Sequence, residues 1–408
     1  MDTGIVRRFS TVTLLCSALL LFSQQDAVAQ KQYVVVNIIP GEKYQPIFEQ
    51  IHGIAKKQSA GHIKLGIGAI FSYLHQSRGQ VTADLHEFLA LAEHYTMPIV
   101  VQLDGEQWWE ARPDLWNWWD PDRPGYNPDN RRNVEWSGWG PEHAIKIAWR
   151  NWGRQIRVLP PPNLMSPPYR EACHAEMRIL VPLILRWWEK LPTSKKDLLI
   201  GVKLGWESAI GVNAFYFPNG NALLDRAEKD DPYVQLKGDQ VPGRGVEAIG
   251  YAAVTTAHLA DSGSLKEAHL AEIVRWHLDD ICGLAAGLGV PRERLFTHVG
   301  GWKEEELLYD AALNAYSCPG WSFYRHASDP ARDMGVQRVL HKSDAPYWAA
   351  VEWLLEGKNS TEGWRNALRR TLSDPKCRYV CIYNWSGIRD DTAAVEAIQS
   401  IVNSPKVR

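Results

Sequence analysis

Two glutamates beside tryptophans are the residues of this 408-residue chain with the clearest potential for chemistry. Glu207 follows the apolar run at residues 198–204 and comes directly after Trp206, and Glu352 lies inside the run at residues 347–353. A carboxylate at the tip of a buried strand is costly to desolvate, and such groups are typical of functional sites. An indole beside Glu207 would raise its pKa, as a general acid requires. A structural ion pair with Arg or Lys is the alternative for both glutamates.

Further polar and aromatic residues follow the predicted strands, and we predict that they bind substrate. The set is Asp104, Trp108, Trp109, Trp206, Asn213, His298, Trp302, Tyr324 and Trp385. The chain has 19 tryptophans, many of them in polar loops, and indoles in such loops suit the flat faces of sugar rings. The alternative for these indoles is that they pin the loops. A strand-end cap is the alternative for Asp104, and Glu356 is the alternative functional carboxylate near Glu352.

The elements that would position these residues are apolar runs typical of buried strands, which mostly alternate with helical segments. The runs span residues 33–39, 63–70, 98–104, 144–149, 197–206, 294–300, 315–323, 347–353 and 378–385. We count eight of these runs as barrel strands, with the run at 98–104 as the second, the weaker run at 144–149 as the third and the run at 197–206 as the fourth. Eight alternating strands with long polar loops predict an α/β protein, a (β/α)8 TIM barrel whose chemistry lies at the strand C-terminal ends. Strands four and seven then face each other across the barrel.

We expect residues 30–408 to form a single catalytic domain on this barrel, with long active-site loops inserted at about 105–140 and 209–265. Carboxylates from opposite strands can face one substrate without sharing a motif. Such a pair is well suited to cleaving a glycosidic bond, with one group as acid and the other as nucleophile or base.

Glutamates that end the fourth and seventh strands, with an aromatic residue closing the eighth, resemble the clan-A arrangement of retaining glycoside hydrolases. The resemblance implies that Glu207 is the acid/base, that Glu352 is the nucleophile and that Trp385 forms part of the sugar-binding floor. It is architectural and covers roughly residues 60–390. The chain departs from the pattern in two places: Trp206 replaces the usual Asn, and Gln102 and Asp104 stand where an Arg is expected.

These observations predict a glycoside hydrolase of the retaining type that acts on an oligo- or polysaccharide and needs no cofactor. A carbohydrate-binding barrel without catalysis is the first alternative, motivated by Trp206. A metal-dependent hydrolase that uses His75, Asp104 and His298 is the second, although no HxH or HxxxH pair supports it.

The N-terminus has the pattern of a Sec-type signal peptide over residues 1–29. Arg7 and Arg8 precede an apolar run at residues 12–22, and Ala27-Val28-Ala29 provides a cleavage sequence. We therefore expect a secreted or periplasmic protein with no membrane span in the mature chain. A formal net charge of −2, from 45 basic and 47 acidic residues, gives no indication of nucleic-acid binding.

Five cysteines would remain after cleavage. Cys377 and Cys381 lie about 13 Å apart along an extended strand, which is beyond the reach of a disulfide. No CxxC pair is present, which argues against zinc.

Overall fold

The computed structural model describes residues 31–55, 62–106, 108–152, 154–207, 210, 214–237, 246–300, 307–324 and 326–403. Eight parallel strands form one sheet in the order β8-β6-β3-β2-β1-β11-β10-β9. Their bounds are β1 (Gln32–Ile38), β2 (Ile63–Ser72), β3 (Ile99–Asp104), β6 (Leu199–Leu204), β8 (Leu295–Thr297), β9 (Gly320–Phe323), β10 (Trp348–Trp353) and β11 (Cys377–Ile382).

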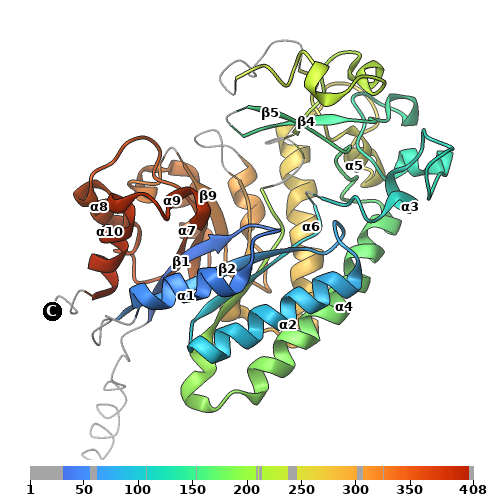
Figure 1. Cartoon of the computed structure of the whole chain (residues 1–408). Helices are drawn as coiled ribbons and strands as arrows, with labels where there is room; N and C mark the ends of the chain where they lie inside the picture. Colours follow the sequence, from blue (N-terminus) through green and yellow to red (C-terminus); the bar gives the residue numbers. More distant parts are fainter. Residues whose placement is uncertain are drawn as a thin grey trace, which may run out of the picture.

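The two edge strands of this sheet meet and nearly close it into a barrel. The Thr297 N–H donates to the Cys318 carbonyl at 3.1 Å, and the Val299 N–H donates to the Gly320 carbonyl at 3.0 Å. These bonds pair β8 with β9 in the parallel sense that the other strands also follow. The predicted (β/α)8 barrel is therefore confirmed (Figure 1).

Helices surround the sheet in the alternating order that the fold requires. Those connecting or following barrel strands are α1 (Tyr44–Ala55), α2 (Arg78–Tyr95), α4 (Pro167–Lys190), α6 (Glu267–Gly287), α7 (Met334–Lys342), α8 (Thr361–Thr371) and α10 (Thr392–Asn403). The described part of the β8–β9 connection contains a 3-10 helix at Leu307–Ala312. Within the described residues, no helix is both long and apolar enough to cross a membrane.

Serine caps begin two of the long helices. The Ser77 hydroxyl accepts the Gln80 N–H at the start of α2, and the Ser166 hydroxyl accepts the Tyr169 N–H at the start of α4. These bonds satisfy N–H groups that have no partner inside the helix. α2 begins soon after β2, and Tyr169 in the first turn of α4 donates its hydroxyl to the Gly105 carbonyl just after β3.

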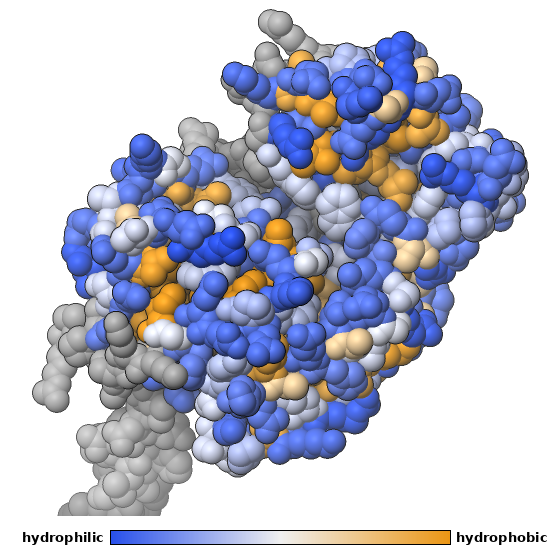
Figure 2. All heavy atoms as spheres, viewed as in Figure 1, coloured by the Kyte–Doolittle hydropathy of each residue, from blue (hydrophilic) through white to orange (hydrophobic). Residues whose placement is uncertain are grey.

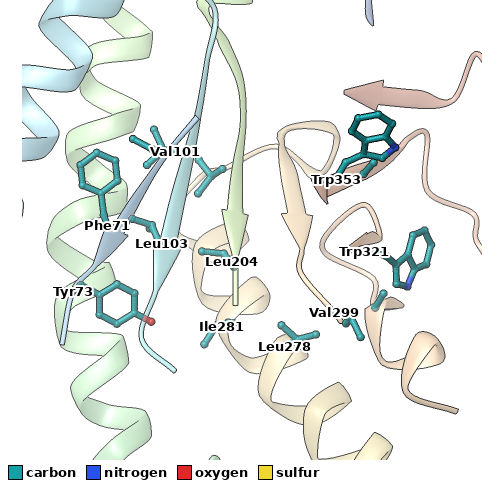
Figure 3. Close-up of a cluster of buried hydrophobic side chains, with 14 of the residues drawn as sticks. Phe71, Tyr73, Val101, Leu103, Leu204, Leu278, Ile281, Val299, Trp321 and Trp353 are labelled. Carbon is teal, nitrogen blue, oxygen red and sulfur yellow. The ribbon is translucent and has the colours of Figure 1, made fainter. Parts of the chain in front are cut away.

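Apolar side chains pack on both sides of the strands. Outside the barrel, Leu204 of β6 faces Leu278 and Ile281 of α6 (Figure 3). Inside it, a second buried cluster contains Val35 and Phe296. Each such side chain contributes about 1.5–3 kcal/mol to stability when buried. The cysteines in the described residues are all buried and unpaired, including Cys377 and Cys381, as expected from their spacing.

The predicted third strand does not belong to the barrel. Residues 148–151 of that region form β4 (Ala148–Asn151), which pairs antiparallel with β5 (Gln155–Val158) and β7 (Ala214–Phe215). A short apolar run does not reveal which sheet a strand will join. The first barrel strand is β1, so β6 remains the fourth strand and β10 the seventh.

The small antiparallel sheet belongs to a lobe built from the segments after β3 and β6. This lobe also holds α3 (Pro113–Trp116) and α5 (Tyr251–Thr256), and it stands beside the barrel in Figure 1. The face in Figure 2 is largely hydrophilic, with hydrophobic patches that include part of the lobe. Because both segments leave the carboxyl ends of barrel strands, the lobe can contribute residues to a site there.

Candidate active site

Glu207 and Glu352 meet at the carboxyl end of the barrel. One carboxylate oxygen from each residue and one ring nitrogen of His298 all lie within 4.8 Å of one another. Glu207 follows β6, and its side chain is buried, as is that of Glu352 in β10. The two glutamates predicted to be catalytic are therefore neighbours in space.

A β-bulge accounts for the direction of Glu352. Ala350 pairs with Trp321 and Glu352 pairs with Ser322, so β10 has one more residue than β9 over this interval. Strict alternation would place Glu352 on the outer face with Ala350. A bulge can redirect a side chain beside an active site, and here it allows Glu352 to reach the barrel interior.

Tyr324 contacts both carboxylates. Its hydroxyl donates a hydrogen bond to Oε1 of Glu352 and also bonds to Glu207. Burial, followed by the charges of the two glutamates, raises the pKa of Tyr324 well above its usual range. The phenol therefore stays protonated near neutral pH, and its single hydrogen can serve one carboxylate of the pair at a time.

The pKa values of both glutamates are raised, mainly by burial. For Glu352 the charge of Glu207 adds to this effect and brings the pKa to about 8. For Glu207 burial is opposed by hydrogen bonds from Ser322 and Tyr324 and by the charge of Arg150. Two close carboxylates do not both ionise readily, so the pair can hold a proton at neutral pH.

A buried cation lies beneath the pair. Nζ of Lys203, on β6, is 2.9 Å from Nδ1 of His298 and 4.6 Å from the ring centre of Trp206. Nε2 of His298 is 2.8 Å from Oγ of Ser322 and 3.8 Å from Oε2 of Glu352. Burial and the Lys203 charge lower the pKa of His298 well below its usual value, so this imidazole is neutral.

A second cation reaches the site from the lobe. Arg150 of β4 is buried, and the charges of Asp104, Glu207, Glu106 and Glu110 act on it. Burial lowers its pKa to about 10, which leaves the guanidinium charged at neutral pH. Its Nε and Nη1 have no hydrogen-bond partner in the described part of the chain. These N–H groups are free to donate to a bound molecule.

Glu106 holds the loop that carries Glu207. Its Oε1 accepts the backbone N–H of Trp206 at 3.2 Å and lies 3.0 Å from Nε2 of His277 on α6. All of these groups are buried. Removing such an acceptor leaves buried donors without partners, which is costly. Glu106 therefore fixes the path of the chain just before Glu207.

The predicted substrate-binding residues fall into separate groups. The ring centres of Trp206 and His298 lie 5.7 Å apart, and His298 and Tyr324 both contact Glu352. Asp104 is buried, accepts the Glu106 N–H at 2.9 Å and affects the pKa of Lys203. This arrangement makes it at least a strand-end anchor. Its contact with substrate stays a prediction.

Trp108 is half-buried and belongs to an aromatic cluster at the end of β3. Its ring centre is 6.0 Å from that of Trp152 and 6.2 Å from that of His75. Arg150 stacks over Trp152 at 5.8 Å, which connects this cluster to the buried guanidinium. The predicted role of Trp108 as a sugar platform is compatible with this position.

Two predicted substrate contacts are buried and donate their indole N–H groups to other parts of the protein. Trp109 is 1% exposed, and its indole N–H donates to the Pro160 carbonyl at 3.1 Å, so it pins the loop. Trp385 begins α9 (Trp385–Ile388), and its indole N–H donates at 2.9 Å to Gln50 of α1, outside the barrel. The aromatic residue of this strand end whose pKa responds to Glu352 and Glu207 is Tyr383. Asn213 and Trp302 lie outside the described residues.

Sequence reasoning missed Lys203, Ser322, Arg150, Glu106 and Tyr383. Lys203 could have been predicted as a site residue, because it is a charged residue inside the apolar run 198–204. Burying such a charge is costly unless specific partners compensate for the lost hydration. Arg150 carried a weaker signal of the same kind. Ser322 and Tyr383 had none, since their roles depend on which strands become neighbours.

The residues that could hold a metal ion are the same three that form the site. Glu207, His298 and Glu352 are the cluster of this kind within the described residues. The alternative set of His75, Asp104 and His298 is not gathered, and His75 instead pairs with Glu110 at 2.6 Å. The ammonium of Lys203 beside His298 disfavours a second cation there by charge repulsion.

These features define a (β/α)8 barrel with a buried carboxylate pair, and structural comparison gives its neighbours. The catalytic domain of β-amylase from Paenibacillus polymyxa matches with a TM-score of 0.50 at 8% identity, over 92% of this chain and 100% of that one. A broad-specificity endoglucanase from an uncultured bacterium matches with a TM-score of 0.42 at 8% identity, over 88% and 85% of the two chains. No protein-family model and no curated protein matches the sequence. The resemblance to clan-A glycoside hydrolases is thus confirmed at the level of fold.

Proposed function

We propose that this protein is a glycoside hydrolase that cleaves glycosidic bonds with retention of configuration. The observation that supports this most is the approach of the Glu207 and Glu352 oxygens to within 4.8 Å at the carboxyl end of the barrel. Carboxyl groups about 5–5.5 Å apart are typical of retaining enzymes, whereas inverting enzymes need about 6.5–9.5 Å to admit water. An oxygen–oxygen approach within 4.8 Å is compatible with the shorter spacing, and we propose direct attack by one carboxylate.

In the first step, an oxygen of Glu352 forms a bond to the anomeric carbon while the bond to the leaving-group oxygen breaks. Glu207 gives its proton to that oxygen. In the second step, Glu207 takes a proton from water, which attacks the anomeric carbon and releases Glu352 as a carboxylate. Tyr324 donates to Glu352 and stabilises its ionised form.

The proton of the pair must lie on Glu207 when the bond breaks. The charge of Lys203 and the hydrogen bond from Tyr324 favour ionised Glu352, against the effect of burial. A glycosidic oxygen beside Glu207 accepts a hydrogen bond only from its protonated form. Substrate binding therefore moves the proton toward Glu207, which the strand positions assign as the acid.

We propose an oligo- or polysaccharide as the substrate. Trp206 packs against His298, and Trp108 and Trp152 form an aromatic cluster beside Arg150, whose N–H groups can donate to hydroxyl groups. Export to the periplasm or the outside of the cell agrees with the signal-peptide pattern of residues 1–29. In that location the enzyme would meet such polymers.

The test is hydrolysis of a panel of α- and β-linked aryl glycosides and oligosaccharides by the wild type, Glu207→Gln and Glu352→Gln. Either substitution should lower kcat by at least about 10³-fold, because each removes a group that acts in the transition state. Glu356→Gln is the matched control, since Glu356 is exposed, and it should retain full activity. Full activity of Glu352→Gln would contradict the proposal.

Two other outcomes point to the alternatives. Sugar binding by the wild type without turnover across the panel would indicate a carbohydrate-binding barrel. Loss of activity on chelation, with recovery on adding a divalent metal, would indicate a metal-dependent hydrolase built on Glu207, His298 and Glu352.

A further inference from the structure

Lys203 is a charged residue inside the barrel. It lies on β6 between the buried residues Val202 and Leu204, and it has no solvent exposure. Taking an ammonium out of water costs several kcal/mol unless close partners offset the loss. The contacts of Lys203 therefore need to be specific, and they all lie at the candidate active site.

The contact with His298 determines where the imidazole carries its proton. Nζ of Lys203 is 2.9 Å from Nδ1 of His298. An ammonium has three donors and no acceptor, so Nδ1 must accept. The proton of the neutral ring then lies on Nε2.

The Nε2–H group continues the chain of hydrogen bonds toward the glutamates. It donates to Oγ of Ser322 at 2.8 Å, which leaves the serine hydroxyl free to donate elsewhere. Ser322 bonds to Glu207, so its proton points to that carboxylate. Lys203 donates to His298, His298 donates to Ser322, and Ser322 donates to Glu207. The donor and acceptor of the last two bonds thus follow from the Lys203–His298 bond.

The strand pairing shows that Lys203 occupies a special position. Gln102 of β3 is its direct neighbour in the β3–β6 ladder. Gln102 lies on the third barrel strand, and its neutral side-chain amide bonds to Asn37. Lys203 is therefore the charged member of this neighbouring pair.

The charged and titratable groups around Lys203 belong to several elements. Asp104 and Glu106 lie at the end of β3, Glu352 on β10 and Cys381 on β11. Glu207 and His298 follow β6 and β8. Burial lowers the pKa of Lys203, and the carboxylates oppose this. In return the Lys203 charge lowers the pKa of both Glu207 and Glu352.

We propose that Lys203 is a positioning residue of the glycosidase reaction, acting through His298 and Ser322 on Glu207 and through its charge on Glu352. This inference rests on the proposed function. Because Ser322 donates to one oxygen of Glu207, the acidic proton is directed to the other oxygen. Because the ammonium lowers the pKa of Glu352 against the effect of burial, it favours the charged form that attacks.

The test compares the pH profiles of kcat/KM for the full-length wild type, Lys203→Met and Lys203→Arg. Lys203→Met should lower kcat/KM about 10²-fold and move the acid limb to higher pH by about one unit, because Glu352 loses an opposite charge. Lys203→Arg keeps a charge that only donates, and it should recover part of the activity and most of the limb position. Lys376→Met, at an exposed lysine, is the control and should match the wild type.

A folded Lys203→Met protein with an unmoved acid limb would overturn the inference, even if activity fell. In that case the loss of activity by Glu352→Gln would still support the proposed function, so the two failures can be told apart. If Lys203→Met does not fold, ¹⁵N-histidine NMR of the wild type, with His298→Gln for assignment, decides. The inference expects the Nε2–H form of His298, and the Nδ1–H form would contradict it.

Discussion

Tyr324, just after β9, donates its phenolic hydrogen to Oε1 of Glu352 on the neighbouring strand β10. The contact crosses the ladder in which Phe323 pairs with Trp353. The same hydroxyl also bonds to Glu207, so one phenol links the two carboxylates. Tyr324 thus contacts both groups that we propose carry the reaction.

Tyr324→Phe removes the donor and keeps the ring. Since the hydrogen bond lowers the pKa of Glu352, its loss should move the acid limb of kcat/KM to higher pH and reduce kcat about 10–100-fold. Tyr316→Phe, at a tyrosine with 41% exposure, serves as the control. A wild-type profile for Tyr324→Phe would show that the phenol has no part in the reaction.

Stability should depend on pH through Glu352. Its pKa is raised in the folded protein to about 8 from an ordinary value of 4.5, so the folded state binds more protons than the unfolded state between these values. The free energy of unfolding therefore falls as pH rises through that interval. Glu352→Gln removes this dependence, and its melting temperature should exceed that of the wild type by a margin that grows from pH 5 to about pH 8. Parallel melting curves would contradict the raised pKa.

Glu106→Ala should disturb the site indirectly, because Glu106 acts on the loop before Glu207 and not on the substrate. It leaves the Trp206 N–H and the His277 ring without their acceptor, at a cost of about 1–3 kcal/mol in unfolding free energy. The loop before Glu207 loses its anchor, so kcat should fall more than KM rises. Glu110→Ala, on the same segment but half-exposed, provides the comparison in denaturation and kinetic assays.

Arg150→Met tests whether the lobe takes part in the site. The guanidinium charge lowers the pKa of Glu207, so its removal should move the basic limb of kcat/KM to higher pH. Loss of its N–H donors should also raise KM. The control is Arg154→Met, at an exposed arginine close to Arg150 in the chain. Equal pH profiles of kcat/KM for the two variants would show that Arg150 does not act in the site.

The sequence predicts the barrel well because strand runs and helices alternate over most of the chain. Glu207 and Glu352 could be found because a carboxylate at the end of an apolar run is conspicuous. The assignment of residues 144–149 to the barrel failed because strand propensity does not identify the partner strand. The eighth barrel strand is instead β1, which forms from the N-terminal run and pairs with β2 and β11.

Side-chain direction was the harder problem. The bulge in β10 depends on pairing with both neighbours, and no local feature marks it. Trp109 and Trp385 were expected at the substrate because tryptophan suits sugars, but a buried indole N–H also needs an acceptor. Pro160 and Gln50 supply those acceptors through contacts that are distant in sequence.

The most direct test of the account is to trap the covalent intermediate. The wild type would be incubated with a 2-deoxy-2-fluoroglycosyl fluoride that matches the sugar it cleaves, and the labelled peptide would be mapped by mass spectrometry. The retaining mechanism predicts one glycosyl ester, on Glu352. A label on Glu207 would exchange the two roles, and no label together with an inverted product would contradict the retaining mechanism.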